Sequence, residues 1–200
     1  MFDYSNMIAV TNRHVFDGES DPETSFLRQI ARVAGFAPKA VVLREKDLSE
    51  RNYADLAVKV LGIGEAKAYL DRHLVIHNYP ETALALGIPR VHLPLAMLRE
   101  LHASEPDLLS RFDVIGTSVH SVADAMEAVS CGATYLFAGN VWETTCKPGL
   151  DGRGLQYLRE VSASVSIPVY GIGGVSEERM PEVLAAGAAG GCMMSGFMTL

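Results

Sequence analysis

Residues 113–138 read DVIGTSVHSVADAMEAVSCGATYLFA and contain the repeating unit that decides the fold. Runs rich in β-branched and aromatic residues stand at both ends, and a helix-length segment joins them. Ser121 is a suitable N-cap with Asp124 three residues later, and Gly132 is a suitable stop signal. The stretch therefore predicts a strand, a helix over 121–132 and a second strand.

The same alternation runs through the whole chain. Most of the strand-like runs are continuous in Val, Ile and Leu, which is typical of strands buried on both faces of a parallel sheet. Eight strand–helix alternations in 200 residues favour an α/β fold of the (β/α)8 TIM barrel type, as a single domain over 1–200, rather than a doubly wound sheet. The predicted strands cover 7–11, 40–45, 73–77, 90–93, 113–119, 133–138, 167–172 and 190–194.

Two helices are expected to depart from the regular pattern. The helix predicted over 176–187 has Ser176 as its N-cap, and Pro181 should cause a kink or a late start. The eighth helix should be truncated or absent, because only six residues follow the last strand. That would leave apolar surface bare on one flank, so either a partner subunit covers it or the final helix lies outside this sequence. We expect a homodimer.

Composition and charge exclude several classes of protein. The sequence is 48% hydrophobic and 20% charged, which is typical of a globular protein. No apolar run is long enough for a membrane helix, and no signal peptide is recognisable at the start, so we expect a cytoplasmic protein. The net charge of −7 argues against nucleic acid as a partner. The three cysteines lack metal-binding spacing, and we expect neither a metal nor a cofactor.

Candidate functional residues follow the strands, because the active site of such a barrel lies at the carboxyl ends of its strands. Arg44 and Lys46 follow the second strand and should point to the same side, which suits an anionic ligand unless they form only a solvated rim. A single histidine at a strand end is more often structural than catalytic, but three at neighbouring strand ends favour a site modestly. The further candidates after strands three to five are His77, Asn78, His92, Ser118 and His120.

A phosphate site is predicted after the last two strands. Gly173 and Gly174 in GIGGVS allow backbone N–H groups to approach a ligand, and the next helix would offer its N-terminus. Ser195 and Gly196 in MMSG follow strand eight. Loops after strands seven and eight form the common phosphate site of these barrels, although glycines also serve tight turns.

The loop after the sixth strand contains an unusual number of polar and reactive side chains. The stretch FAGNVWETTCKPG, 137–149, contains Asn140, Thr144, Lys147 and the only tryptophan of the chain. Lys147 adds a cation and Thr144 adds a hydroxyl donor. The glycines that follow predict a loop able to fold over a ligand. Cys146 is interpreted as a small buried apolar residue, because no base lies beside it in the sequence.

These motifs together resemble the thiamine phosphate synthase/TenI family over nearly the whole chain. The stretch ETTCKPGLDGRG, 143–154, is most similar to the TenI branch, the thiazole tautomerases. The resemblance implies that Arg44, Lys46 and Lys147 hold a pyrophosphate in the synthases, and that the loops at Gly173, Gly174 and Ser195 bind the phosphate of a thiazole. The motifs that carry it are VLREK, VHLP, IGTSVHS, FAGNVWETTCKPG, IPVYGIGGV and GAAGGCMMSG.

Key family residues are replaced in this chain. The synthases have an Asn-Asp pair after strand three and an Asp after strand four, and these aspartates hold Mg²⁺; here the pair is His77 and Asn78, and the strand-four position is Met97. Synthase activity is therefore not expected, since Mg²⁺ prefers carboxylate oxygens. The tautomerases have a proton-transferring His where this chain has Asn140, and an amide cannot transfer a proton near neutral pH.

Three functions remain open at this point. The first is a TenI-like thiazole tautomerase whose proton transfer has moved to His77, the preferred candidate, or to His120. The second is a non-catalytic or regulatory barrel that binds a phosphorylated thiazole or thiamine phosphate. The third is a thiamine phosphate synthase, a transferase, which the missing carboxylates disfavour.

Overall fold

The structure, a computed structural model, describes residues 2–144, 149 and 151–200. Eight parallel strands form a closed barrel in which sequence neighbours are also spatial neighbours. This confirms the (β/α)8 barrel, and every predicted strand coincides with an observed one to within two residues. The strands are β1 (Met7–Val10), β2 (Ala40–Leu43), β3 (Leu74–His77), β4 (Arg90–Pro94), β5 (Val114–Val119), β6 (Tyr135–Gly139), β7 (Val169–Ile172) and β8 (Gly190–Met193).

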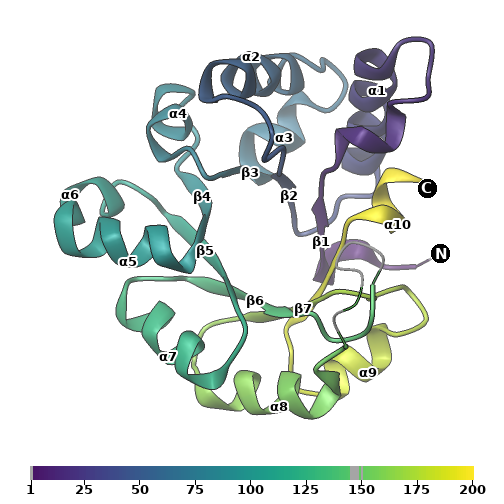
Figure 1. Cartoon of the computed structure of the whole chain (residues 1–200). Coiled ribbons are helices and arrows are strands. Elements are labelled where there is room, and N and C mark those ends of the chain that lie inside the picture. The colour runs from purple at the N-terminus through teal and green to yellow at the C-terminus, as the bar shows by residue number, and fades with distance from the viewer. Residues whose placement is uncertain (1, 145–148, 150) are drawn as a thin grey trace. The chain divides into compact units, whose positions relative to one another are not determined.

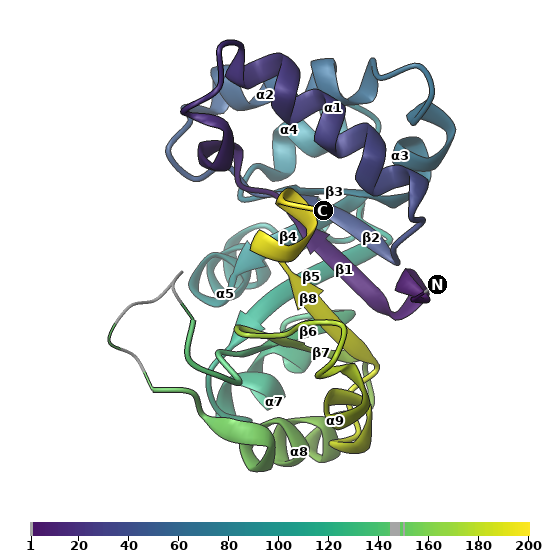
Figure 2. The same ribbon diagram turned by 90° about the vertical axis from the view of Figure 1, so that its right-hand side faces the viewer.

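The chain divides into two compact units, and the first comprises Met1–Ile88 and Met194–Leu200. Strand β2 pairs with β1 and with β3 in parallel register. Figure 2 shows the helices α1 to α4 gathered on one side of these strands. The helical elements of this unit are η1 (Tyr4–Asn6), η2 (Arg13–Phe16), α1 (Pro22–Gly35), α2 (Glu50–Leu61), α3 (Lys67–His73), α4 (Pro80–Ala85) and α10 (Ser195–Met198).

Helix α1 illustrates why these segments are helical. Asp21 caps it by accepting a hydrogen bond from the backbone N–H of Thr24 at 3.2 Å. Pro22 stands in the first turn, where a missing N–H costs nothing. Phe26 and Ile30 lie four residues apart, so they share one face of the helix, and both are buried. Burial of each such side chain contributes about 1.5–3 kcal/mol.

The second unit comprises Pro89–Met193. Its strands β4 to β8 pair in sequence order, all in parallel. Figure 1 shows the helices of this unit on the outer side of its strands. They are α5 (Leu95–Ser104), α6 (Pro106–Leu109), α7 (Val122–Ser130), α8 (Gly154–Ser164) and α9 (Met180–Ala185).

The two capping predictions in this unit had different outcomes. Ser121 caps α7 by accepting a hydrogen bond from the backbone N–H of Asp124 at 3.0 Å, as predicted. Ser176 does not cap α9, so that prediction is wrong: its hydroxyl lies 2.7 Å from a carboxylate oxygen of Glu178. The expected late start is confirmed, because α9 begins at Met180 with Pro181 in its first turn.

The eighth helix is reduced to the four residues of α10, as expected. Phe197 is fully buried, and its ring centroid lies 5.4 Å from that of Tyr4. The side-chain amide of Gln29 on α1 donates a hydrogen bond to the carbonyl oxygen of Phe197 at 2.6 Å. The short helix therefore packs on α1 inside the first unit.

The described surface carries large exposed apolar side chains only singly, on four different elements. They are Val15 on η2, Val58 on α2, Met126 on α7 and Leu184 on α9. The expected homodimer stays a prediction. Within the described ranges, no helix is both long and apolar enough to cross a membrane.

Candidate active site

A buried carboxylate organises the end of strand β2. Glu45 is only 2% exposed and accepts a hydrogen bond from the Thr11 hydroxyl at 2.6 Å. The backbone N–H of Arg13 donates to Glu45 at 3.1 Å, and the Arg13 guanidinium lies 3.3 Å from it. The Thr11 hydroxyl also accepts from the backbone N–H of Arg44 at 2.9 Å. These bonds fix the backbone that presents Arg44 and Lys46.

The positive charges of Arg44 and Lys46 act on His77 at the end of the neighbouring strand β3. His77 is buried at the end of β3, and its backbone N–H donates to the Tyr53 hydroxyl at 2.9 Å. Burial and, to a smaller extent, the charges of Arg44 and Lys46 together lower the pKa of His77 to about 3. His77 is therefore a neutral and weakly basic imidazole at neutral pH, which makes it a poor general acid.

Asn78 follows His77 in a left-handed backbone conformation with φ of 70°. Its side-chain oxygen is buried and has no hydrogen-bond partner in the described part of the chain. Backbone strain of this kind is found more often at functional sites than elsewhere.

The residues do not fit a magnesium site. Asn78 offers an amide, and Met97, half-buried on α5, offers no oxygen. The buried carboxylate of Glu45 is already occupied by Thr11 and Arg13. Among residues 2–144, 149 and 151–200, no group of three His, Cys, Asp or Glu side chains is placed to hold a metal ion. The donor set thus lacks the carboxylates that Mg²⁺ prefers.

In the second unit, His92 joins Ser118 to Tyr135. His92 is 2% exposed; its Nε2 lies 3.0 Å from the Ser118 hydroxyl and its Nδ1 lies 2.9 Å from the Tyr135 hydroxyl. Burial raises the pKa of Tyr135 well above its usual value, so this phenol stays protonated. Ser118 is half-buried, which leaves its hydroxyl at the accessible end of the chain of hydrogen bonds.

His120 lies beside the loop that follows strand β6. Its Nδ1 is 2.8 Å from the carbonyl oxygen of Gly139, and its backbone N–H donates to Asp124 at 2.9 Å. A carbonyl oxygen can only accept, so Nδ1 must carry a proton. In the neutral imidazole Nε2 then keeps its lone pair. The structure therefore brings His120 next to Asn140, the residue after Gly139.

Asn140 is buried and has a structural role of its own. Its side-chain amide donates to the carbonyl oxygens of Trp142 at 3.2 Å and Asp151 at 3.4 Å. Its backbone also packs against Gly173, where an added Cβ would come within 2.5 Å of the Asn140 side chain. Only glycine fits there, since its φ is also positive at 92°.

The glycine loop after β7 is packed against the loop after β6. The backbone N–H of Trp142 donates to the carbonyl oxygen of Gly173 at 3.0 Å. Arg179 donates to the carbonyl oxygen of Gly174 at 2.5 Å, and its guanidinium lies 4.8 Å from the centre of the Trp142 ring. The two loops thus form one assembly with a cation beside the predicted phosphate site.

Other predicted residues are accounted for individually. Thr144 is half-buried in the loop after β6, and Lys147 and Cys146 lie outside the described residues. Ser195 and Gly196 begin α10 in the first unit, whereas Gly173 and Gly174 belong to the second. Sequence reasoning missed Arg13, Tyr135 and Arg179. Arg179 lies three residues after GIGGVS, within the helix predicted over 176–187, so its charge was a usable signal. The pairings of Arg13 and Tyr135 depend on residues distant in the sequence.

Comparisons with known proteins identify relatives of this chain over nearly its whole length. A family model described as thiamine monophosphate synthase matches residues 8–197. The chain is 34% identical over 194 residues to a thiamine-phosphate synthase of Enterococcus faecalis, covering 94% of this chain and 84% of that protein. It is 35% identical over 159 residues to a thiamine-phosphate synthase of Clostridium acetobutylicum, covering 80% and 73%. A solved structure, the thiamine phosphate pyrophosphorylase from Pyrococcus furiosus, has a TM-score of 0.77 at 26% identity and covers 99% of this chain and 89% of that chain.

Proposed function

Because the chain belongs to the thiamine monophosphate synthase family, we propose that it binds a phosphorylated thiazole and isomerises it by moving a proton between two ring atoms. One observation carries the proposal. A titratable side chain, His120, is held by Gly139, which directly precedes the position where the tautomerases have their proton-transferring His. The proposed proton carrier, His120, follows the neighbouring strand of the same unit.

His120 has the arrangement that a general base needs. The hydrogen bond from Nδ1 to Gly139 holds the ring and leaves Nε2 as the atom that accepts a proton from a ring carbon. The resulting imidazolium then returns a proton to a second ring atom, so the reaction consumes and releases none. His77 does this less well, because its low pKa makes it a weaker base than an ordinary histidine.

Ser118 and His92 supply a second route for a proton. If His92 Nδ1 donates to Tyr135, His92 Nε2 accepts from Ser118. The Ser118 hydroxyl can then take a proton from the ligand while it passes its own to His92. In this scheme the hydrogen bonds of Asn140 hold the loop in place. The position thus has a structural role here, whereas in the tautomerases its histidine is catalytic.

The phosphate of the ligand is assigned to the glycine loop at Gly173 and Gly174. Their positive φ angles turn the backbone in a way that lets N–H groups converge on an anion. Arg179 adds a positive charge beside Gly174. Ser195, Gly196, Thr144 and Lys147 remain proposed phosphate contacts, and Arg44 and Lys46 are proposed contacts for a second anionic group.

Thiamine phosphate synthesis is the second candidate, and the names of the relatives favour it. It requires a metal-bound pyrophosphate in the family to which the chain is similar, and Asn78 and Met97 stand where the metal carboxylates would be. A binding protein without catalysis is the third candidate. In that case the ligand would be the same phosphorylated thiazole or thiamine phosphate, and His120 would have only a structural role.

Calorimetry and isotope exchange together test the proposal. We expect thiazole phosphate to bind without Mg²⁺ and unphosphorylated thiazole to bind at least tenfold more weakly. In D2O, an isomerase returns deuterium to the ring carbon, which NMR detects. His120→Asn should abolish this exchange but keep binding, and the matched control His102→Asn, an exposed residue on α5, should change neither. Binding without any exchange would support the non-catalytic alternative.

We also propose that the protein is a homodimer. The support is general, since closed two-fold dimers are the commonest assembly among soluble oligomers. Light scattering across the micromolar range should give twice the mass of one chain. A stable monomer would show that α1 and α10 need no partner.

A further inference from the structure

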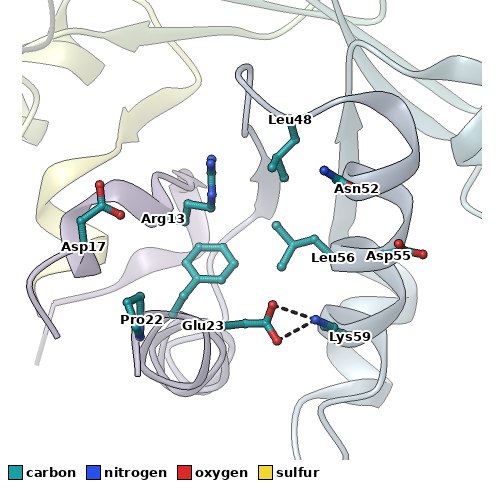
Figure 3. Close-up of a pocket in the computed structure, with 10 residues that line it drawn as sticks. Arg13, Asp17, Pro22, Glu23, Leu48, Asn52, Asp55, Leu56 and Lys59 are labelled. Atoms are coloured by element: carbon teal, nitrogen blue, oxygen red, sulfur yellow. Dashed lines mark hydrogen bonds and ion pairs between the residues drawn. The ribbon is translucent and has the colours of Figure 1, made fainter. Parts of the chain in front are cut away.

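A pocket of about 330 Å³ lies in the first unit, among the segments that follow β1 and β2 and the helices α1 and α2. Figure 3 shows Leu56 pointing into it from α2, with Leu48 above. Phe26 of α1 also lines it. None of its lining residues is among those assigned above to the thiazole phosphate. The lining residues are Arg13, Asp17, Pro22, Glu23, Phe26, Leu48, Asn52, Asp55, Leu56 and Lys59.

The inner wall of the pocket is apolar. Phe26 is 1% exposed and Leu56 is 7% exposed, so both belong to the packed interface between α1 and α2. Leu48 closes the pocket from the loop that precedes α2. The volume is at the lower end of the range for sites that bind small molecules. A ligand of one substituted ring fits this volume, with Leu48 as the most accessible of these three apolar side chains.

The two cations that line the pocket both form ion pairs. Lys59 on α2 donates to both carboxylate oxygens of Glu23 on α1, each at 2.7 Å (Figure 3). Arg13 pairs with Asp47 and Glu45, which hold it at the opposite end. Asp47 has a pKa lowered by this hydrogen bond, so it remains ionised. Both permanent cations are thus already neutralised.

Carboxylates outnumber the cations around the pocket. Arg13 and Lys59 are the two permanent cations, and five carboxylates lie on the lining or bond to it. Asp17 has His14 as its partner at 2.8 Å, a contact exposed to solvent. Asp55 contributes a further negative charge at the rim. The five carboxylates are Asp17, Glu23, Glu45, Asp47 and Asp55.

We propose that this pocket binds a small organic cation that carries one planar apolar ring. The ring would lie beside Leu48 and the exposed edge of Leu56, and the cationic group would face the excess of carboxylates at the rim. An anion would have to displace a carboxylate from Arg13 or Lys59, so it should bind far more weakly.

Three probes of similar shape distinguish the contribution of charge to binding from that of ring packing. Benzamidine is a cation, benzamide is neutral and benzoate is an anion. NMR titration of the full chain, in the presence of saturating inorganic phosphate, should give saturable binding of benzamidine at least tenfold tighter than of the other two. The shifted resonances should belong to α1 and α2. Equal affinity for all three probes, or shifts confined to the strand-end residues, would overturn the proposal.

Two variants make the location testable. Asn52→Trp places a large ring at an exposed position of the rim and should abolish benzamidine binding while circular dichroism and thiazole phosphate binding stay unchanged. Asp55→Asn should weaken binding several-fold, and the control Asp107→Asn, an exposed carboxylate on α6, should not. Unchanged benzamidine affinity in the folded Asn52→Trp protein would rule this pocket out. Because phosphate binding is measured separately, failure here leaves the proposed isomerase untouched.

Discussion

The Nδ1 atom of His120 lies 2.8 Å from the carbonyl oxygen of Gly139, the residue directly before Asn140. His120 closes the end of strand β5, and Gly139 closes the end of the neighbouring strand β6. The bond therefore ties a titratable ring to the loop from which the catalytic histidine of the tautomerases is missing. Asn140, after β6, stands where the tautomerases have their proton-transferring histidine, and His120, after the neighbouring strand β5, is the candidate replacement.

The buried hydrogen bonds of His92 should contribute to stability. We expect His92→Leu to lower the free energy of unfolding by roughly 1–3 kcal/mol, because it leaves the Tyr135 hydroxyl buried without its partner. Urea unfolding monitored by circular dichroism measures this. The double change of His92→Leu with Tyr135→Phe should recover part of the loss. If the single variant is as stable as the wild type, His92 does not link these groups.

The effect of changing Arg179 should be visible in the fluorescence of Trp142, the only tryptophan of the chain. Its guanidinium stacks on Trp142, so Arg179→Ala should shift the intrinsic fluorescence and weaken thiazole phosphate binding about tenfold by removing a charge beside Gly174. Arg179→Lys should keep most of the binding but less of the stacking. Fluorescence titration reports both effects. Binding that is insensitive to Arg179→Ala would separate this residue from the phosphate site.

The glycine loop itself should not tolerate a side chain. Gly174 has φ of 70°, and a Cβ there would come within 2.6 Å of the Trp142 Cβ. Gly174→Asp should therefore abolish phosphate-ester binding through both steric conflict and negative charge, as calorimetry would show. Gly18→Asp is a matched control, because the space around Gly18 is open. Crystals grown in sulfate should place the anion near Gly173 and Gly174, and an anion found consistently elsewhere would contradict the assignment.

Acid should destabilise the protein through His77. Its pKa is about 3 in the folded state and near 6.5 when unfolded, so the unfolded state binds more protons below pH 6.5. The stability that the neutral form contributes is fully present above pH 6.5 and is lost progressively as the pH falls toward 3, by at most about 5 kcal/mol. His77→Gln should flatten this part of the curve of unfolding free energy against pH. An unchanged slope in that variant would assign the acid sensitivity to other groups.

Synthase turnover should be absent. We expect no thiamine phosphate from pyrimidine pyrophosphate and thiazole phosphate in the presence of Mg²⁺, because Asn78 and Met97 supply no carboxylate. Product analysis by chromatography measures this, with a thiamine-phosphate synthase from a relative as the positive control. Turnover at about 1 s⁻¹ or faster would show that other groups can replace those carboxylates.

The strands were predictable because their signal is local. Runs of Val, Ile and Leu, together with Ser121 as a helix cap, determine where β5 and α7 lie. The N-cap of α9 was less predictable from the sequence than the strands were. Ser176 could cap a helix or bond to Glu178, and the choice depends on three-dimensional packing. For the candidate site, the sequence identified His120 and Asn140 as residues of interest. Their proximity through Gly139 depends on the pairing of two strands, which no local pattern records.

The preference between the two candidate histidines also depended on the fold. His77 looked the better proton carrier in the sequence, because it stands where the synthases have an amide. Its burial beside two cations, however, makes it weakly basic. An environment of this kind is assembled from residues on different strands, so the sequence alone could not reveal it.

Isomerisation rates of the wild type and three variants test the central claim most directly. The assay follows conversion of a thiazole phosphate tautomer by NMR. The account predicts that the wild type turns over, that His120→Asn slows it by roughly 10²-fold or more, and that His77→Asn changes it by less than about tenfold. An inactive wild type that gains activity on Asn140→His would contradict the account, because the protein would then be a binder that has lost its catalyst.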